Sequence, residues 1–157
     1  MKRRLIVTIL TFMISMVGIF NLSTNVKAET MVEDIDMSSL MTDTALIGYA
    51  QGQTWGVYFS DGHSIINRIS SSKLGAGGVT NAAKKCTVQV TAILERKNSA
   101  GAWARVTSWT QTNQNAYSAM ISKSVTVSSG YYYRVRCYHY AGTDSATSFT
   151  SALYIGN

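Results

Sequence analysis

The sequence predicts an all-β domain, built as an antiparallel sandwich of about seven or eight strands. From residue 45 onward the chain runs in short stretches rich in Thr, Val, Ile, Tyr and Trp, which favour strands. Gly, Ser, Asn and Asp interrupt these stretches, and no helical repeat of apolar residues lies between the interruptions. Turn residues at this spacing, in a chain long enough for one core, are typical of a single sandwich or barrel.

Residues 1–28 are predicted to be a secretory signal peptide. A basic start at Lys2–Arg4 precedes the apolar stretch Leu5–Phe20, and Val26-Lys27-Ala28 places small residues at the expected cleavage point after Ala28. The apolar stretch is shorter than the roughly 20 residues that a spanning helix needs, although an uncleaved anchor is the alternative. We therefore expect a secreted protein, extracellular or associated with a cell wall, with no transmembrane segment after cleavage.

Residues 29–44 form a short acidic arm that precedes the sandwich domain, residues 45–157. The whole chain carries 14 Lys and Arg against 8 Asp and Glu, a net charge of +6. Five of the acids lie in the arm and four of the cations lie in the signal peptide, so the domain itself is basic. We expect the arm to be poorly ordered or a short helix; the alternative is that it folds back on the basic domain. The positive charge of the domain favours polyanions as partners; the alternative is that this charge only keeps the protein soluble.

The individual strands are bounded by turn residues. Gly75–Gly78 is expected to be a flexible connection, and Asp61-Gly62 is expected to be a turn that starts a strand. The expected strands lie near residues 54–59, 63–70, 78–83, 85–96, 102–110, 117–127, 131–141 and 147–155.

Cys86 and Cys137 are expected to form one disulfide, because an even pair in a small exported domain usually does. Trp103 lies on the strand after Cys86 and is expected in the core, and tyrosines precede Cys137. This order of Cys, Trp and Cys resembles the immunoglobulin-type sandwich, and the tyrosine-rich strand is also similar to one in fibronectin type III domains. The resemblance implies an immunoglobulin-like sandwich and does not specify the order in which the strands pair.

A further resemblance covers residues 94–140. The motifs that carry it are Leu94-Glu95-Arg96, Gly101-Ala102-Trp103, Val106-Thr107-Ser108-Trp109-Thr110, Val125-Thr126-Val127, Gly130-Tyr131-Tyr132-Tyr133-Arg134-Val135-Arg136 and Tyr138-His139. The segment resembles small secreted proteins of Gram-positive bacteria, a family of unknown function. The resemblance implies source and export, and it supplies no catalytic or ligand residue.

The stretch Gly130–Ala141 is the most informative part of the chain. Its aromatic and β-branched residues predict a central strand whose side chains alternate between two faces. One face, with Cys137 and His139, suits a core. The other is the candidate ligand face, made of Tyr132, Arg134, Arg136, Tyr138 and Tyr140. Rings and guanidinium groups in that arrangement can stack on sugars and bind anions, or can stabilise neighbouring strands.

No catalytic residue, metal ligand set or cofactor is predicted. The domain has too few acids for paired-carboxylate chemistry, and His63, His139 and the cysteines do not form a metal motif. Among the tryptophans, Trp55 is the one free to bind sugar. We expect a non-enzymatic binding module for an anionic wall polymer or a glycan, without specific nucleic-acid binding. The alternative is a cationic interbacterial or host-directed effector that acts on a membrane or a protein receptor.

Overall fold

The computed structural model describes residues 30–51 and 56–156, so the predicted signal peptide and Trp55 lie outside the described residues. Within them, no helix is long and apolar enough to cross a membrane. The elements in chain order are β1 (Val32–Asp34), the 3-10 helix η1 (Met37–Ser39), β2 (Leu46–Tyr49), β3 (Phe59–Ser70), β4 (Lys73–Lys97), β5 (Trp103–Thr126), β6 (Tyr131–Ala141), β7 (Asp144–Phe149) and β8 (Leu153–Ile155).

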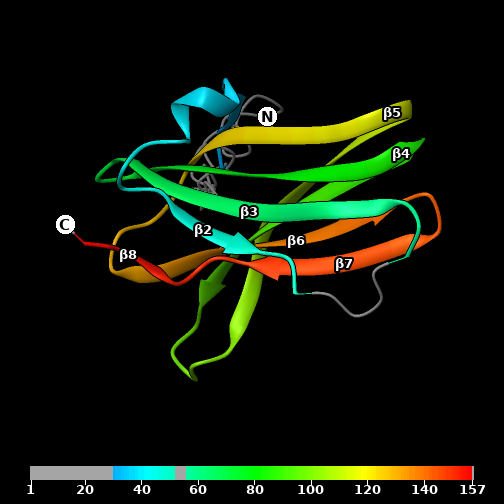
Figure 1. Ribbon diagram of the computed structural model, residues 1–157. Helices are drawn as coiled ribbons and strands as arrows, with labels where there is room; N and C mark the ends of the chain where they lie inside the picture. Colours follow the sequence, from blue (N-terminus) through cyan, green and yellow to red (C-terminus); the bar gives the residue numbers. More distant parts are fainter. Residues whose placement is uncertain (1–29, 52–55, 157) are drawn as a thin grey trace, which may run out of the picture.

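The eight strands form one antiparallel sheet, which confirms the all-β prediction (Figure 1). Five strands follow the order β1-β5-β4-β3-β2, while β6 pairs with β4, β7 and β8. The first part of β4, residues 73–82, pairs with β3, and the last part, residues 88–96, pairs with β6. A register shift between Asn81 and Cys86 separates these parts, so the long β4–β5 hairpin belongs to both halves of the sheet.

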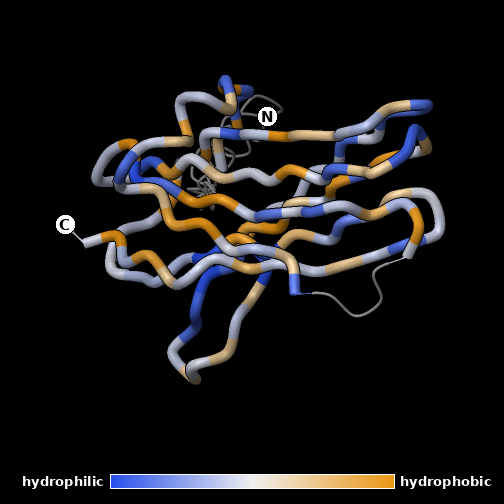
Figure 2. The backbone as a smooth tube through the Cα atoms, in the orientation of Figure 1, coloured by the Kyte–Doolittle hydropathy of each residue, from blue (hydrophilic) through white to orange (hydrophobic). Residues whose placement is uncertain are grey.

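The two halves fold toward each other and enclose the core. Apolar side chains of β3 and the first part of β4, such as Ile66 and Leu74, pack in one buried cluster with Val90 and Val135 from the other half. Apolar and polar residues alternate along much of the long strands (Figure 2), as expected for strands that are buried on one side. The outer side of the half formed by the last part of β4, β6 and β7 therefore faces away from this core.

The glycine run Gly75–Gly78 is not the predicted flexible connection; it lies inside β4 and pairs with both β3 and β5. Glycine is required here by close packing. A Cβ atom on Gly77 would lie 2.3 Å from the Ile121 carbonyl oxygen, and one on Gly78 would lie 2.5 Å from the Cys137 sulfur. The predicted turn at Asp61-Gly62 is also wrong, because both residues lie within β3 next to a register shift.

The acidic arm is ordered, which corrects the prediction of a poorly ordered segment. β1 pairs with residues 123–125 of β5, and Glu33 and Asp34 form ion pairs with Lys73 and Lys123. Farther along the arm, the fully buried Leu40 lies over Gly75 and Gly77. The arm thus folds back on the basic domain, which was the alternative prediction. The side chain of Leu40 fills the space over the two glycines.

The predicted disulfide between Cys86 and Cys137 is wrong, because both cysteines are free. Cys137 is opposite Ala92 in the β4–β6 ladder, six residues along β4 from Cys86. Six residues of strand span about 20 Å, whereas the Cα atoms of a disulfide lie within about 7 Å. Burial raises the pKa of Cys137, so this thiol stays protonated in the core.

His139 is a fully buried polar residue between the two halves. Its Nδ1 lies 2.8 Å from Thr80 Oγ1, and its Nε2 lies 2.8 Å from Ser148 Oγ. Thr80 donates its hydroxyl to the Gln89 carbonyl, so it accepts from Nδ1–H of His139, while Nε2 accepts from Ser148. These bonds fit a neutral imidazole. Burial, with a smaller effect of nearby His63, lowers the pKa of His139 to about 4, and Asp61 partly opposes the shift.

We expect the free energy of unfolding to fall by about 2 kcal/mol between pH 7.5 and pH 5, because the unfolded imidazole binds protons that the folded one does not. This contribution is complete above pH 6.5 and is lost as the pH falls toward 4. Urea unfolding at the two pH values measures it. His139→Gln should remove most of the change, whereas His63→Gln should remove a smaller part of it, because burial also lowers the pKa of the half-buried His63. An unaltered pH dependence in His139→Gln would contradict the assignment.

Candidate functional site

The side chains of β6 alternate as predicted. Tyr133, Val135, Cys137 and His139 are buried. The predicted ligand residues all lie on the opposite, outer face: Tyr132, Arg134, Arg136, Tyr138 and Tyr140. Neighbouring strands extend this face, because Thr147 of β7 is opposite Tyr138 in the ladder. We call the outer side of β6, β7, β8 and the last part of β4 the aromatic face.

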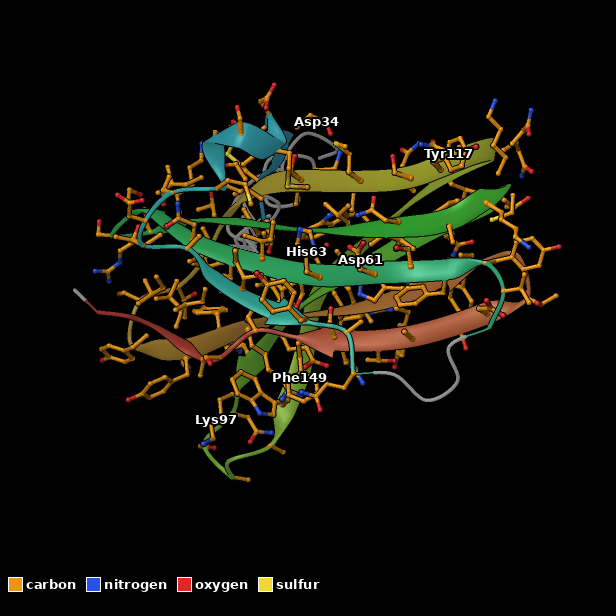
Figure 3. All side chains as sticks on the ribbon, viewed as in Figure 1. Asp34, Asp61, His63, Lys97, Tyr117 and Phe149 are labelled. Atoms are coloured by element: carbon orange, nitrogen blue, oxygen red, sulfur yellow. The ribbon has the colours of Figure 1, made fainter. Side chains whose placement is uncertain are left out.

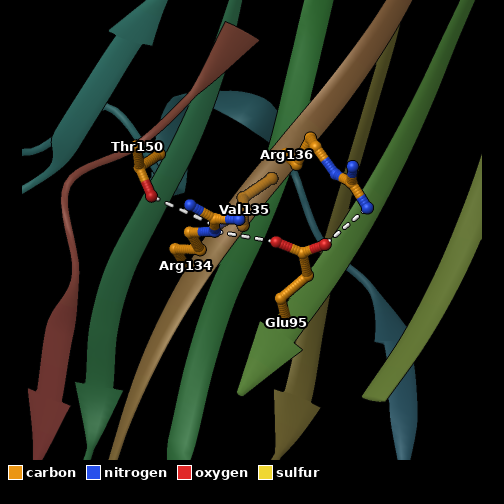
Figure 4. Close-up of polar contacts among 5 residues, drawn as sticks. All are labelled: Glu95, Arg134, Val135, Arg136 and Thr150. Carbon is orange, nitrogen blue, oxygen red and sulfur yellow. Dashed lines mark hydrogen bonds and ion pairs between the residues drawn. The ribbon is translucent and has the colours of Figure 1, made fainter. Parts of the chain in front are cut away.

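Both arginines of the aromatic face bind one carboxylate, that of Glu95 on β4 (Figure 4). Arg134 Nε lies 2.7 Å from Oε2, and an Nη atom of Arg136 lies 2.6 Å from Oε1. The Glu95 side chain is only 4% exposed, whereas those of Arg134 and Arg136 are 23% and 34% exposed. The arrangement follows from register, since Glu95 is opposite Arg134 in the ladder. The three charged groups depend on one another, because removing the carboxylate would leave two unpaired cations, and together they carry one net positive charge.

Aromatic rings further occupy the two guanidinium groups. The Cζ atom of Arg134 lies 4.4 Å from the ring centroid of Trp103 and 5.6 Å from that of Phe149. Arg136 lies 5.3 Å from the centroid of Tyr138. Such cation–π contacts hold the arginines flat against the sheet. Arg134 and Arg136, which were predicted to contact a ligand, therefore bind neighbouring side chains of the aromatic face.

Trp103 lies on the outer face, not in the predicted core position. A register shift between Leu94 and Glu95 inserts one extra residue into β5, which reverses the side-chain alternation beyond that point. Trp109 is opposite Ala92, before the shift along β4, and it packs against the core. The bulge therefore brings the indole of Trp103 over Arg134.

A shallow groove without any charged residue in its lining crosses the aromatic face. Its lining residues are Gln51, Tyr138, Tyr140, Ser145, Ala146, Thr147 and Phe149. Tyr140 and Phe149 are 45% and 56% exposed, so their rings are free to contact a ligand. The Gln51 backbone bridges to Thr147, which fixes the end of β2 against β7 and closes one side of the groove. The groove thus offers rings for stacking beside hydroxyl and amide groups for hydrogen bonding.

A second aromatic pair lies farther along the same face. Tyr132 and Tyr154 are opposite each other in the β6–β8 ladder, with ring centroids 4.9 Å apart, and both rings are exposed. Figure 3 shows Phe149 on the same lower side of the molecule as the projecting β4–β5 hairpin, where Lys97 lies. Exposed rings therefore lie at intervals along the length of the face.

Sequence reasoning missed four residues of the face: Gln51, Glu95, Phe149 and Tyr154. Phe149 and Tyr154 lie in one predicted strand, but they are five residues apart, so a period-two reading places their rings on opposite faces. In the structure that stretch is divided into β7 and β8, and both rings are exposed. Gln51 and Glu95 carry no local signal either, because their positions depend on pairing between distant strands.

Other chemistry-bearing residues do not converge on a site. Within residues 30–51 and 56–156, no group of three or more His, Cys, Asp and Glu could hold a metal ion. Asp61 accepts a hydrogen bond from Asn81, and Asp144 accepts from the backbone N–H groups of Tyr58 and Phe59. Those backbone bonds lower the pKa of Asp144, which is a structural acceptor for the chain that enters β3.

Comparison with known proteins identifies one family. No curated protein and no solved structure matches the chain significantly. Residues 31–153 match a family model described as a family of unknown function, DUF6147. The matched segment begins in the acidic arm and ends in β8, so it includes nearly all of the described fold. The chain therefore belongs to the DUF6147 family of unknown function.

Proposed function

We propose that this protein is a secreted, non-enzymatic module that binds a neutral glycan chain of a cell envelope or matrix along the aromatic face. The observation that carries the proposal is the uncharged groove, in which Tyr138, Tyr140 and Phe149 lie beside Gln51 and Thr147. Aromatic rings combine a large apolar surface with a defined geometry, which suits the flat apolar side of a sugar ring. Hydroxyl and amide groups nearby can exchange hydrogen bonds with sugar hydroxyls.

The charges of the face favour a neutral glycan over an anionic polymer. A polyanion site requires cations that are free to bind, and Arg134 and Arg136 already share the carboxylate of Glu95. The groove itself is open and shallow, a shape suited to an extended chain and poorly suited to a small enclosed ligand. The predicted signal peptide and the resemblance to small secreted proteins of Gram-positive bacteria support an envelope or matrix as the place of action.

A binding role is also favoured over hydrolysis. Each acid of the sandwich domain serves the structure: Glu95 holds two arginines, Asp61 binds Asn81, and Asp144 accepts from backbone N–H groups. Glycoside hydrolysis needs two carboxyl groups on either side of the scissile bond. The groove lining contains none.

Retention on insoluble glycans tests the proposal. The protein from residue 29 onward is incubated with purified wall and matrix polysaccharides, and bound protein is measured after washing. Phe149→Ala and Tyr140→Ala should each lower the affinity about tenfold, as expected for a central aromatic contact. Tyr49→Ala and Tyr117→Ala remove exposed tyrosines outside the groove lining and serve as matched controls. Equal retention of all four variants would refute a site on the aromatic face.

A further inference from the structure

A cavity of about 280 Å³ lies between the β4–β5 hairpin and the end of β5. Two arginines line it, Arg96 and Arg105, together with three residues that carry hydroxyl groups, Thr126, Ser128 and Tyr133. Arg96 is opposite the buried Tyr133 in the β4–β6 ladder, so these two side chains lie on the core side of the sheet. The cavity shares no lining residue with the groove, and it is therefore separate from the aromatic face.

Two tyrosines hold the guanidinium group of Arg96 in place. Its Cζ atom lies 4.4 Å from the ring centroid of Tyr131. The hydroxyl of Tyr133 donates to the Ser128 carbonyl at 2.8 Å, so its oxygen can accept a hydrogen bond from Arg96. Burial raises the pKa of Tyr133, and the hydrogen bond and positive charge of Arg96 partly oppose this rise. One ring and one acceptor leave most of the five N–H groups of a guanidinium available to a ligand.

The β-bulge in β5 brings Arg105 to the same cavity. The register shift between Leu94 and Glu95 leaves Val106 without a partner on β4. A bulge interrupts the strict alternation of side chains between the two faces of a strand. Three consecutive residues, 104–106, accordingly line the cavity. Arg105 is exposed, so its charge is accessible to an ion that enters from solvent.

In the part of the chain that the structure describes, no carboxylate pairs with either arginine of the cavity. None of the lining residues is Asp or Glu, and the ion pairs of the described residues all involve other cations. Arg134 and Arg136 differ in this respect, because they share the carboxylate of Glu95 (Figure 4). A cavity lined by charges of one sign attracts ions of the opposite sign. Arg96 and Arg105 therefore indicate an anion site.

We propose that this cavity binds a phosphate group through Arg96 and Arg105, with the hydroxyl groups of Thr126 and Ser128 as further donors. A guanidinium group donates two parallel hydrogen bonds to phosphate. Phosphate has more acceptor oxygens than a carboxylate, so it can engage two guanidinium groups and hydroxyls together. The cavity is slightly smaller than the roughly 300–1,000 Å³ of a typical ligand site, which suits a charged group better than a whole ligand. The proposal does not rest on the glycan site.

Titration at constant ionic strength tests the phosphate site. Inorganic phosphate, dimethyl phosphate or acetate replaces chloride around the isotope-labelled protein from residue 29 onward, and NMR follows the arginine Nε–H signals. The signals of Arg96 and Arg105 should saturate with inorganic phosphate at a dissociation constant of about 1 mM or lower. Equal affinity for dimethyl phosphate would assign the site to phosphodiesters, and weaker affinity would assign it to free or terminal phosphate. Acetate should bind at least about tenfold more weakly than phosphate.

Charge-removing variants locate the site. Arg96→Gln should weaken phosphate binding at least about tenfold, because it removes the guanidinium that the tyrosines hold in place. Arg105→Gln should weaken it about threefold, since an exposed charge contributes less, and this exposed position leaves the fold intact. Arg96→Lys keeps the charge without the paired donors and should not restore wild-type affinity. Arg68→Gln removes an exposed charge outside the cavity and is the matched control, which should bind as the wild type does.

Three results would overturn the proposal. The first is a wild type whose arginine signals do not saturate with phosphate. The second is acetate binding as tight as phosphate binding. The third is an Arg105→Gln affinity equal to that of Arg68→Gln, a comparison that holds even if Arg96→Gln does not fold.

Discussion

Replacing Glu95 with alanine is expected to lower the free energy of unfolding by about 3 kcal/mol. The carboxylate is almost fully buried and is bound by Arg134 and Arg136 at 2.7 and 2.6 Å. Without it, two guanidinium groups remain close together on the sheet with no anion between them. Removing one partner of a buried ion pair costs about 3–5 kcal/mol, and the partial exposure of the arginines places this case at the lower end.

Glu33→Ala is the matched control for Glu95→Ala. Glu33 forms an ion pair with a single cation, with 2.9 Å between its Oε2 atom and Lys73 Nζ, and both side chains are substantially exposed. An exposed ion pair of this kind contributes about 0–1 kcal/mol. Urea unfolding of both variants at pH 7.5 gives the comparison. A cost for Glu95→Ala within 1 kcal/mol of the Glu33→Ala cost would show that the shared carboxylate does not hold the face together.

Replacing Leu40 with alanine is also expected to lower the free energy of unfolding by about 3 kcal/mol. Leu40 is fully buried although it lies in the acidic arm, and its methyl groups occupy the space over Gly75 and Gly77. Because the glycines have no side chains to move inward, the cavity left by alanine cannot close easily, and such cavities add to the lost transfer energy.

Met41→Ala controls for a general effect of shortening the arm, because the neighbouring Met41 is exposed. Substitutions at exposed positions usually change the free energy of unfolding by less than about 0.5 kcal/mol. Chemical unfolding, followed by tryptophan fluorescence, separates the two variants. If both cost the same small amount, the arm is not an integral part of the domain.

Features with a local cause could be predicted from the sequence. Strand β6 is an example, because its eleven residues are rich in tyrosine, which favours a strand, and successive side chains of a strand point to opposite faces. The alternation alone places Cys137 inside and Arg134 outside, and the structure agrees. The all-β class follows from the same kind of evidence, since turn residues and short apolar stretches act within a few positions of each other.

Features that depend on contacts between distant segments could not be predicted. Gly75–Gly78 has the composition of a loop, yet it is a strand because Leu40 and Cys137 pack closely against it. The expected disulfide rested on the compartment, whereas the register of β4 and β6 separates the two cysteines. The predicted role of the two arginines as ligand contacts changed for the same reason, because their shared partner Glu95 lies 39 positions before Arg134 in the chain.

Salt dependence of glycan binding tests the central claim most directly. The affinity of the protein for soluble fragments of the retained polymer is measured by calorimetry at low and at high ionic strength. Stacking on Tyr140 and Phe149 is screened little by salt, so we expect a change of less than about twofold between 0.05 and 0.5 M salt. A loss of tenfold or more over this range would contradict the account, because it would mean that free cations, and not the rings of the groove, hold the ligand.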